Sequence, residues 1–84
     1  MALWECDVAT RNFTRWPPAG CTIIAMSESL GNWRALVEAD DEAALKAHPN
    51  VTGVRPAGDG WYSDTSSGVR YEVRGGRLGN RQEY

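Results

Sequence analysis

Hydrophobic and polar residues alternate with a period of two along several short stretches of the chain. Near the N-terminus, Ala2, Trp4, Cys6 and Val8 occupy every second position, and the same alternation recurs over residues 33–39. Successive side chains of a β-strand point to opposite faces of a sheet, so this pattern is typical of half-buried strands. The sequence therefore predicts a strand in each stretch.

Residues 32–55 predict a strand, a short helix and a second strand. Asp40 is suited to cap the helix, because its carboxylate can accept hydrogen bonds from the free N–H groups of the first turn. The two acids after it lie in that turn, where the positive end of the helix dipole stabilises negative charge. Pro49 ends the helix, since a proline disfavours helical geometry in the residue before it. We expect one short helix over about residues 41–48.

The rest of the chain supplies further strands. Residues 21–26 are apolar on both faces, as in a central strand. Residues 61–64 and 69–74 predict two strands around a turn, and Asp59-Gly60 is typical of a tight hairpin. The predicted fold class is α+β, with a mostly antiparallel sheet of five to six strands and the short helix on one face.

The length of the chain, 84 residues, allows one hydrophobic core. We expect a single domain over residues 1–74. Residues 75–84 have three glycines among the first five and little to bury, which predicts a flexible Gly/Arg-rich C-terminal tail. The apolar positions of the predicted elements define the expected core: Trp4, Cys6, Val8, Ile23, Ala25, Trp33, Ala35, Val37, Leu45, Val54, Tyr71 and Val73.

Charge is unevenly distributed along the chain. The net charge of −2 gives no overall attraction to nucleic acid or to anionic membranes. Five acids and one arginine lie between Glu28 and Glu42, whereas four arginines and two glutamates lie between Gly68 and Tyr84. This asymmetry fits either a solvated surface or a head-to-tail contact between copies.

No stretch approaches the ~20 apolar residues that a membrane-spanning helix needs, and the first residues lack the pattern of a secretory signal. The two cysteines, Cys6 and Cys21, are therefore expected to be reduced and to behave as small buried hydrophobes. The alternative is a disulfide that closes a loop of ~15 residues and contributes ~3 kcal/mol.

Histidine and cysteine, the usual ligands of zinc, are scarce in this sequence. His48 is the single histidine and lies where the helix dipole favours its charged form. The acids at the start of the helix are explained by capping, and no serine lies in the context of a nucleophile. The sequence predicts no enzyme, no catalytic or metal site and no cofactor.

Two segments carry candidate contact residues. The loop over residues 10–20 contains a stiff Pro-Pro pair beside two aromatic rings, which either fold over the core or form an arm that docks into a neighbouring subunit. The tail combines arginines with an apolar and an aromatic residue. The predicted partner contacts are Phe13, Arg15, Trp16, Arg77, Leu78, Arg81 and Tyr84.

The order of the pieces resembles a known class of proteins. The strand with Leu3, Trp4, Cys6 and Val8, a proline-bearing loop, the ALVEAD strand and the segment HPNVTGVRP follow one another over residues 3–56. This order is similar to that of small structural proteins of tailed bacteriophages. The resemblance implies a virion component of the capsid surface, neck or tail, present in many copies and assembled in the host cytoplasm.

We therefore expect a non-enzymatic structural protein that binds copies of itself or a larger virion protein, without a small-molecule substrate. One alternative is an inhibitor of a host enzyme, in which the acidic run over residues 38–42 imitates nucleic acid. The other is a nucleic-acid-binding module, which predicts that the affinity for nucleic acid falls steeply as the salt concentration rises. Its candidate residues are the arginines and tyrosines near the C-terminus, Arg70, Tyr71, Arg74, Arg77, Arg81 and Tyr84.

Overall fold

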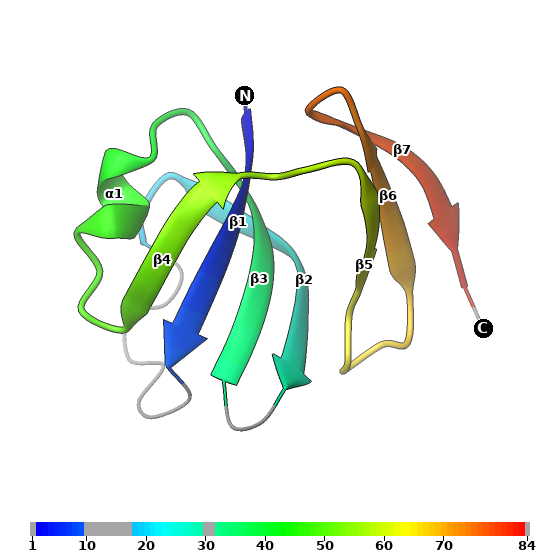
Figure 1. The fold of residues 1–84 in the computed structure, drawn as a ribbon, viewed down its shortest axis with the longest axis horizontal. Coiled ribbons are helices and arrows are strands. Elements are labelled where there is room, and N and C mark those ends of the chain that lie inside the picture. The colour runs from blue at the N-terminus through cyan, green and yellow to red at the C-terminus, as the bar shows by residue number, and fades with distance from the viewer. Residues whose placement is uncertain (1, 10–17, 30–31, 84) are drawn as a thin grey trace.

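A computed structural model describes residues 2–9, 18–29 and 32–83, which form two antiparallel sheets and one short helix (Figure 1). No helix in these ranges has the length and hydropathy needed to cross a membrane. The elements follow one another as β1 (Ala2–Ala9), β2 (Cys21–Ser29), β3 (Asn32–Ala39), α1 (Ala43–Lys46), β4 (Val51–Pro56), β5 (Gly60–Ser63), β6 (Arg70–Arg74) and β7 (Arg77–Gln82).

The first sheet has the strand order β2-β3-β1-β4. β1 lies inside this sheet and pairs with β3 along its whole length, with Trp4 opposite Val37. On its other side β1 pairs with β4, with Cys6 opposite Val54. The side chains of Trp4, Cys6 and Val8 therefore share one face, as their alternation predicts.

The second sheet has the order β5-β6-β7. β6 and β7 are joined by Gly75-Gly76, whose φ angles are 55° and 78°. Two consecutive positive φ angles characterise the two-residue turns that suit the twist of a hairpin, and glycine adopts them without a steric penalty. This turn explains why glycine occupies both positions.

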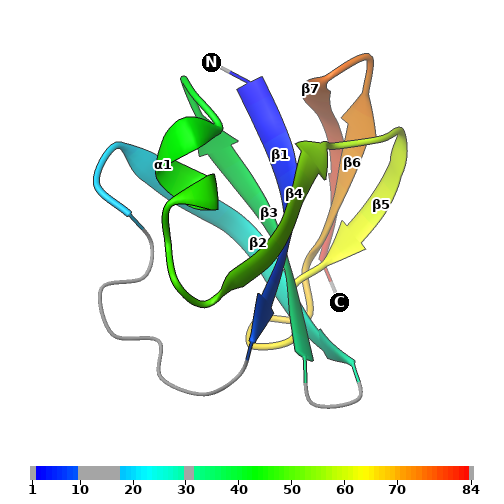
Figure 2. The same ribbon diagram turned by 60° about the vertical axis from the view of Figure 1, so that its left-hand side comes forward.

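The two faces of the first sheet are covered differently (Figure 2). On one face, Leu45 of α1 packs with Cys6, Val8, Ala35, Val37 and Ala39. On the other face, the second sheet contributes Val73 to a smaller cluster that also contains Leu3, Ala25, Leu36 and Ala57. The molecule thus has three layers, with the first sheet between the helix and the second sheet.

The loop between β5 and β6 covers part of the outer edge of β2. The backbone N–H of Met26 donates to Asp64 Oδ1 at 3.2 Å, and the backbone N–H of Thr65 donates to the Met26 carbonyl at 2.8 Å. Hydrogen bonds from Ser67, Met26 and Ser66 lower the pKa of Asp64 although its burial acts to raise it. Asp64 is therefore held in its charged, accepting form at this edge.

Several predictions need correction. The fold is mostly antiparallel with one short helix, as expected, but the described residues form seven strands in two sheets instead of one sheet of five or six. The helix covers Ala43–Lys46, and its N-cap is Glu42 without a side-chain cap; Asp41, and not Asp40, accepts a hydrogen bond from the Ala43 N–H at 3.0 Å.

The expected core is also incomplete. Leu36 was assigned to the polar face of its strand but is buried against the second sheet. Asp59-Gly60 does not close a hairpin, because β4 and β5, which flank it, belong to different sheets; Asp59 Oδ1 instead accepts from the Gly75 N–H at 2.9 Å. The predicted tail, residues 75–84, contains the paired strand β7, and its flexibility stays a prediction.

Candidate functional site

A polar cleft follows the face of the first sheet that also carries the smaller apolar cluster, and one part of it reaches β5 of the second sheet. Its floor is a row of residues that face one another across four strands: Ser27 on β2, Arg34 on β3, Asp7 on β1 and Gly53 on β4. In the next row, Glu5 on β1 lies opposite Arg55 on β4. The alternation of each strand brings these polar side chains to the face that the second sheet only partly covers.

Arg55 binds both carboxylates of the cleft. Its Nη1 donates to Asp7 Oδ2 at 2.9 Å, its Nη2 donates to Asp7 Oδ1 at 3.3 Å, and it forms a further ion pair with Glu5. The hydrogen bonds from Arg55 hold the pKa of Asp7 below its ordinary value, and the same bonds raise the pKa of Arg55. Both groups are therefore charged throughout the physiological range.

Gly53 leaves room for this ion pair. A Cβ atom at this position would lie 3.1 Å from Asp7 Oδ2 and 3.6 Å from Arg55 Nη1. The first distance is shorter than an ordinary contact, and Arg55 holds the carboxylate of Asp7 in place. A side chain at position 53 would therefore require Asp7 to shift by a few tenths of an ångström, whereas the distance to Arg55 is an ordinary van der Waals contact.

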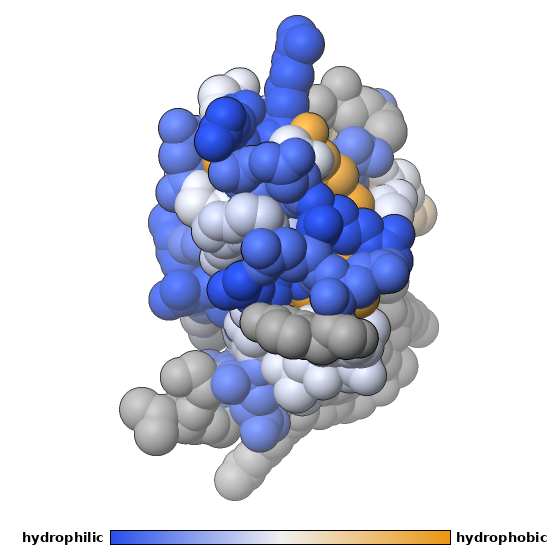
Figure 3. Space-filling model, turned by 90° about the vertical axis from the view of Figure 1, so that its right-hand side faces the viewer, coloured by the Kyte–Doolittle hydropathy of each residue, from blue (hydrophilic) through white to orange (hydrophobic). Residues whose placement is uncertain are grey.

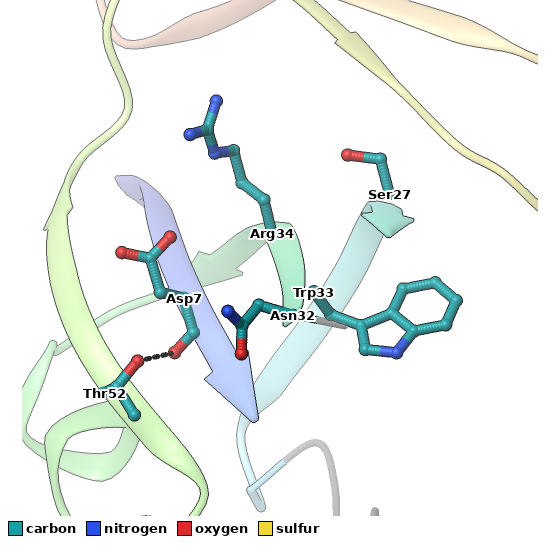
Figure 4. Close-up of a pocket in the computed structure, with 6 residues that line it drawn as sticks. All are labelled: Asp7, Ser27, Asn32, Trp33, Arg34 and Thr52. Carbon is teal, nitrogen blue, oxygen red and sulfur yellow. Dashed lines mark hydrogen bonds between the residues drawn. The ribbon is translucent and has the colours of Figure 1, made fainter. Parts of the chain in front are cut away.

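Arg34 and Ser27 line two adjacent cavities of the cleft. One is a cavity of about 540 Å³ lined by Asp7, Ser27, Asn32, Trp33, Arg34 and Thr52, drawn in Figure 4. The other, of about 370 Å³, lies toward β5 and is lined in part by Glu5, Arg34 and Tyr62. In Figure 4 the side chain of Arg34 extends between those of Asp7 and Ser27.

Tyr62 lies at the β5 side of the cleft. Its hydroxyl donates to the Gly58 carbonyl at 2.9 Å. Burial raises the pKa of Tyr62, and the nearby charge of Glu5 raises it further. The phenol is therefore neutral at physiological pH and acts as a fixed hydrogen-bond donor.

The outer face of the second sheet forms the other candidate surface. Trp61 is 41% exposed, and the guanidinium of Arg70 lies 5.3 Å from the centre of its ring. Arg70 also donates to Gln82 on β7. Figure 3 shows that this end of the molecule is mostly hydrophilic, with hydrophobic residues visible between polar ones.

Glu72 fixes β7 to the rest of this sheet. Its side chain accepts hydrogen bonds from the backbone N–H and the amide group of Asn80, at 3.3 and 3.0 Å, and from Arg74 Nε at 3.2 Å. The register of β6 and β7 shifts by one residue at this point. The carboxylate thus satisfies a backbone N–H at the bulge, where regular strand pairing is interrupted.

The structure brings together three of the predicted contact residues. Arg77, Leu78 and Arg81 all lie on β7 and are exposed, Leu78 to 43%. The guanidinium of Arg81 lies 5.7 Å from the centre of the Tyr71 ring and forms an ion pair with Glu83. The remaining predicted contacts lie outside the described residues: Phe13, Arg15, Trp16 and Tyr84.

Cys6 and Cys21 are free thiols in the structure. Burial raises the pKa of Cys6 to about 11, so its thiol is protonated at physiological pH. In the part of the chain that the structure describes, no three His, Cys, Asp or Glu side chains are placed to hold a metal ion.

The sequence pattern did not identify the cleft residues Glu5, Asp7, Arg34 and Arg55 as a site. A signal was present, because acids and arginines occupy the polar positions of strands that had been predicted individually. Their meeting depends on the order of the strands, which the alternation of each strand does not determine.

Comparisons with protein-family models, with curated proteins and with solved structures find no match to this chain.

Proposed function

We propose that this protein is a non-enzymatic structural component of a bacteriophage particle, which binds a second copy of itself or a larger virion protein through strand β7. The phage origin rests on the sequence resemblance over residues 3–56. The proposed contact rests on the exposed edge of the second sheet.

The observation that carries the proposal is the exposure of every residue of β7, Arg77–Gln82, at the end of its sheet. An edge strand offers unpaired N–H and C=O groups to which another strand can add. The outer edge of β2 is partly covered by Asp64 and Thr65, and β5 has only four residues. The remaining edge strand, β4, has six residues like β7, but only two of them are exposed, whereas all six residues of β7 are exposed.

The two alternatives have less support. Three of the four C-terminal arginines are already engaged, Arg70 with Trp61 and Gln82, Arg74 with Glu72, and Arg81 with Glu83. Phosphate contacts require arginines that are free to reach the backbone of a nucleic acid. For the inhibitor alternative, two of the three acids at the start of α1 serve the helix locally: Asp41 accepts from the Ala43 N–H and Glu42 pairs with Lys46.

The direct test is the composition of phage particles. Particles purified by density gradient from cells that replicate a phage encoding this chain are expected to contain it in many copies, as measured by quantitative mass spectrometry. Its absence from purified particles, with the free chain present in the lysate, would contradict the proposal.

The edge contact is tested with two variants of Leu78. In a two-residue hairpin the pair next to the turn exchanges backbone hydrogen bonds and the following pair does not, so the N–H of Leu78 points away from β6. Leu78→Pro removes this outward donor, whereas Leu78→Ser keeps it. We expect Leu78→Pro to abolish incorporation or self-association, measured by sedimentation over a range of concentrations, and Leu78→Ser to retain it. Equal behaviour of both variants would rule out strand addition at β7.

A further inference from the structure

Arg34 places a cation at the centre of the polar cleft. It lies directly opposite Asp7 on one neighbouring strand and Ser27 on the other. The Cβ atoms of such cross-strand neighbours are about 4.5–5.5 Å apart. The side chain is exposed and borders both cavities of the cleft. Any small group that enters the cleft at this point therefore meets Arg34.

The ion pairs of the cleft leave Arg34 available. Glu5 and Asp7 are both bound by Arg55. Within residues 2–9, 18–29 and 32–83, Arg34 forms no ion pair, although its charge contributes to lowering the pKa of Asp7. In the same ranges, the side chains of Ser27 and Asn32 form no hydrogen bond. Asn32 lies two positions before Arg34 and therefore on the same face of β3. Three polar side chains with unused donors thus line one cavity.

We propose that Arg34, with the Ser27 hydroxyl and the Asn32 amide, binds a carboxylate group in this cleft. The planar guanidinium presents two parallel N–H donors, which match the two oxygens of a carboxylate. The hydroxyl and the amide supply donors beside it. The cavity of about 540 Å³ accommodates a small acid or an acidic side chain.

The charge of the cleft favours a carboxylate over a phosphate. Arg34 and Arg55 balance Glu5 and Asp7, so the four groups have no net charge. For a dianionic phosphate, the repulsion from Asp7 and the attraction to Arg34 both double, whereas the cost of removing the ion from water grows with the square of its charge; the single available cation therefore suits a singly charged carboxylate better. The source of the carboxylate is either a free organic acid or an Asp or Glu side chain of another protein.

The proposal is tested by NMR titration of the full chain labelled with ¹⁵N. The probes are sodium acetate and the blocked tripeptide Gly-Glu-Gly, each exchanged for sodium chloride at constant ionic strength. We expect the backbone amide signals of Ser27, Asn32 and Arg34 to shift and to saturate. Tighter binding of the peptide identifies a protein side chain as the source, and equal binding identifies a free acid.

Arg34→Gln is expected to weaken binding roughly tenfold or more, because the charged fork is lost. Arg34→Lys keeps the charge without the fork and is expected to bind with intermediate affinity. The matched control is Lys46→Gln, which removes an exposed cation from α1, outside the cleft, and should leave binding unchanged. The proposal would be overturned by signals that never saturate, by signal shifts that persist in Arg34→Gln, or by binding that weakens equally in Lys46→Gln.

If Arg34→Gln does not fold, Ser27→Ala provides a second variant. Its binding is measured from the same amide signals of the cleft. It removes one donor while the arginine remains, and weaker binding is expected. Two outcomes together would contradict the proposed site: unchanged binding in Ser27→Ala, and full binding in a folded Arg34→Lys. They would show that Arg34 acts only as a diffuse charge. The test does not depend on β7 or on assembly.

Discussion

The two sheets of this protein differ in how their side chains are protected from solvent. In the first sheet, Val8, Ala35 and Val37 are completely buried beneath α1, and the opposite face also contributes buried residues. In the second sheet, Val73 is completely buried, whereas β7 is exposed along its whole length. The first sheet therefore contributes most of the buried hydrophobic residues, and the second is a thin layer that leaves its outer face and edge accessible.

The largest effect is expected from truncating the anchor of the helix. Leu45→Ala removes a completely buried side chain and should lower the free energy of unfolding by about 2–5 kcal/mol. The same substitution at Leu78, on the exposed strand β7, should cost less than about 0.5 kcal/mol. Urea unfolding monitored by tryptophan fluorescence measures both values, and similar costs would contradict the contrast between the sheets.

A smaller effect is expected from breaking the ion pairs of the cleft. Arg55→Met leaves Glu5 and Asp7 without their cation and should cost about 1–3 kcal/mol, less than a fully buried pair because the Arg55 side chain is 42% exposed. Arg81→Met, which removes the exposed pair with Glu83 and the contact with the Tyr71 ring in the second sheet, should cost less than about 1 kcal/mol. Urea unfolding at pH 7 compares the two.

The cost of Arg55→Met should depend on pH. The pKa of Asp7 is lowered in the folded protein, so its stabilisation is complete above the ordinary value of 3.8 and is lost as the pH falls through the folded value. The difference in stability between the wild type and Arg55→Met should therefore be constant near neutrality and shrink below about pH 4. A difference independent of pH would mean that lost packing by the arginine stem, and not the ion pair, causes the effect.

The attachment of β7 can be tested at Glu72. Glu72→Ala removes the acceptor of the Asn80 backbone N–H and should cost about 1–2 kcal/mol. Hydrogen exchange should accelerate at the β7 amides and remain slow in β1 and β3, whereas Glu83→Ala should change neither. Equal acceleration in both sheets would indicate that they unfold as one unit.

The smallest effect is expected at Gly53. Gly53→Ala places a methyl group 3.1 Å from a carboxylate oxygen that Arg55 holds in place, so we expect a loss of about 1 kcal/mol. Gly58→Ala meets no atom within 4 Å and should be neutral or stabilising by up to about 1 kcal/mol, because it restricts the unfolded chain. Thermal unfolding ranks the two variants.

The strands of the first sheet could be predicted because one face of each carries the core. The alternation of Trp4, Cys6 and Val8, and of Trp33, Ala35 and Val37, places these residues against α1. Leu36 was missed because alternation assigns it to a polar face. A second sheet covers that face, and the pattern of a single strand contains no information about a second covering layer.

The second sheet and the cleft depend on long-range pairing. Residues 75–84 have the composition of a tail, yet Gly75-Gly76 forms a turn and Glu72 satisfies the bulge. Composition alone does not distinguish a flexible glycine-rich end from a hairpin. Arg34 and Asp7 meet because β1 lies beside β3, a result of strand order and not of local sequence.

The position of β1 inside its sheet has a consequence for the rate of folding. β1 pairs with β3, about 30 residues further along the chain, and with β4, almost 50 residues further, whereas β6 and β7 are joined by a two-residue turn. Closing long loops costs entropy before any contact forms, so sheets built from distant strands fold slowly, while hairpins form in about 1–10 μs. The β6–β7 hairpin is therefore expected to form early, and the insertion of β1 between β3 and β4 sets the rate at which the native protein appears.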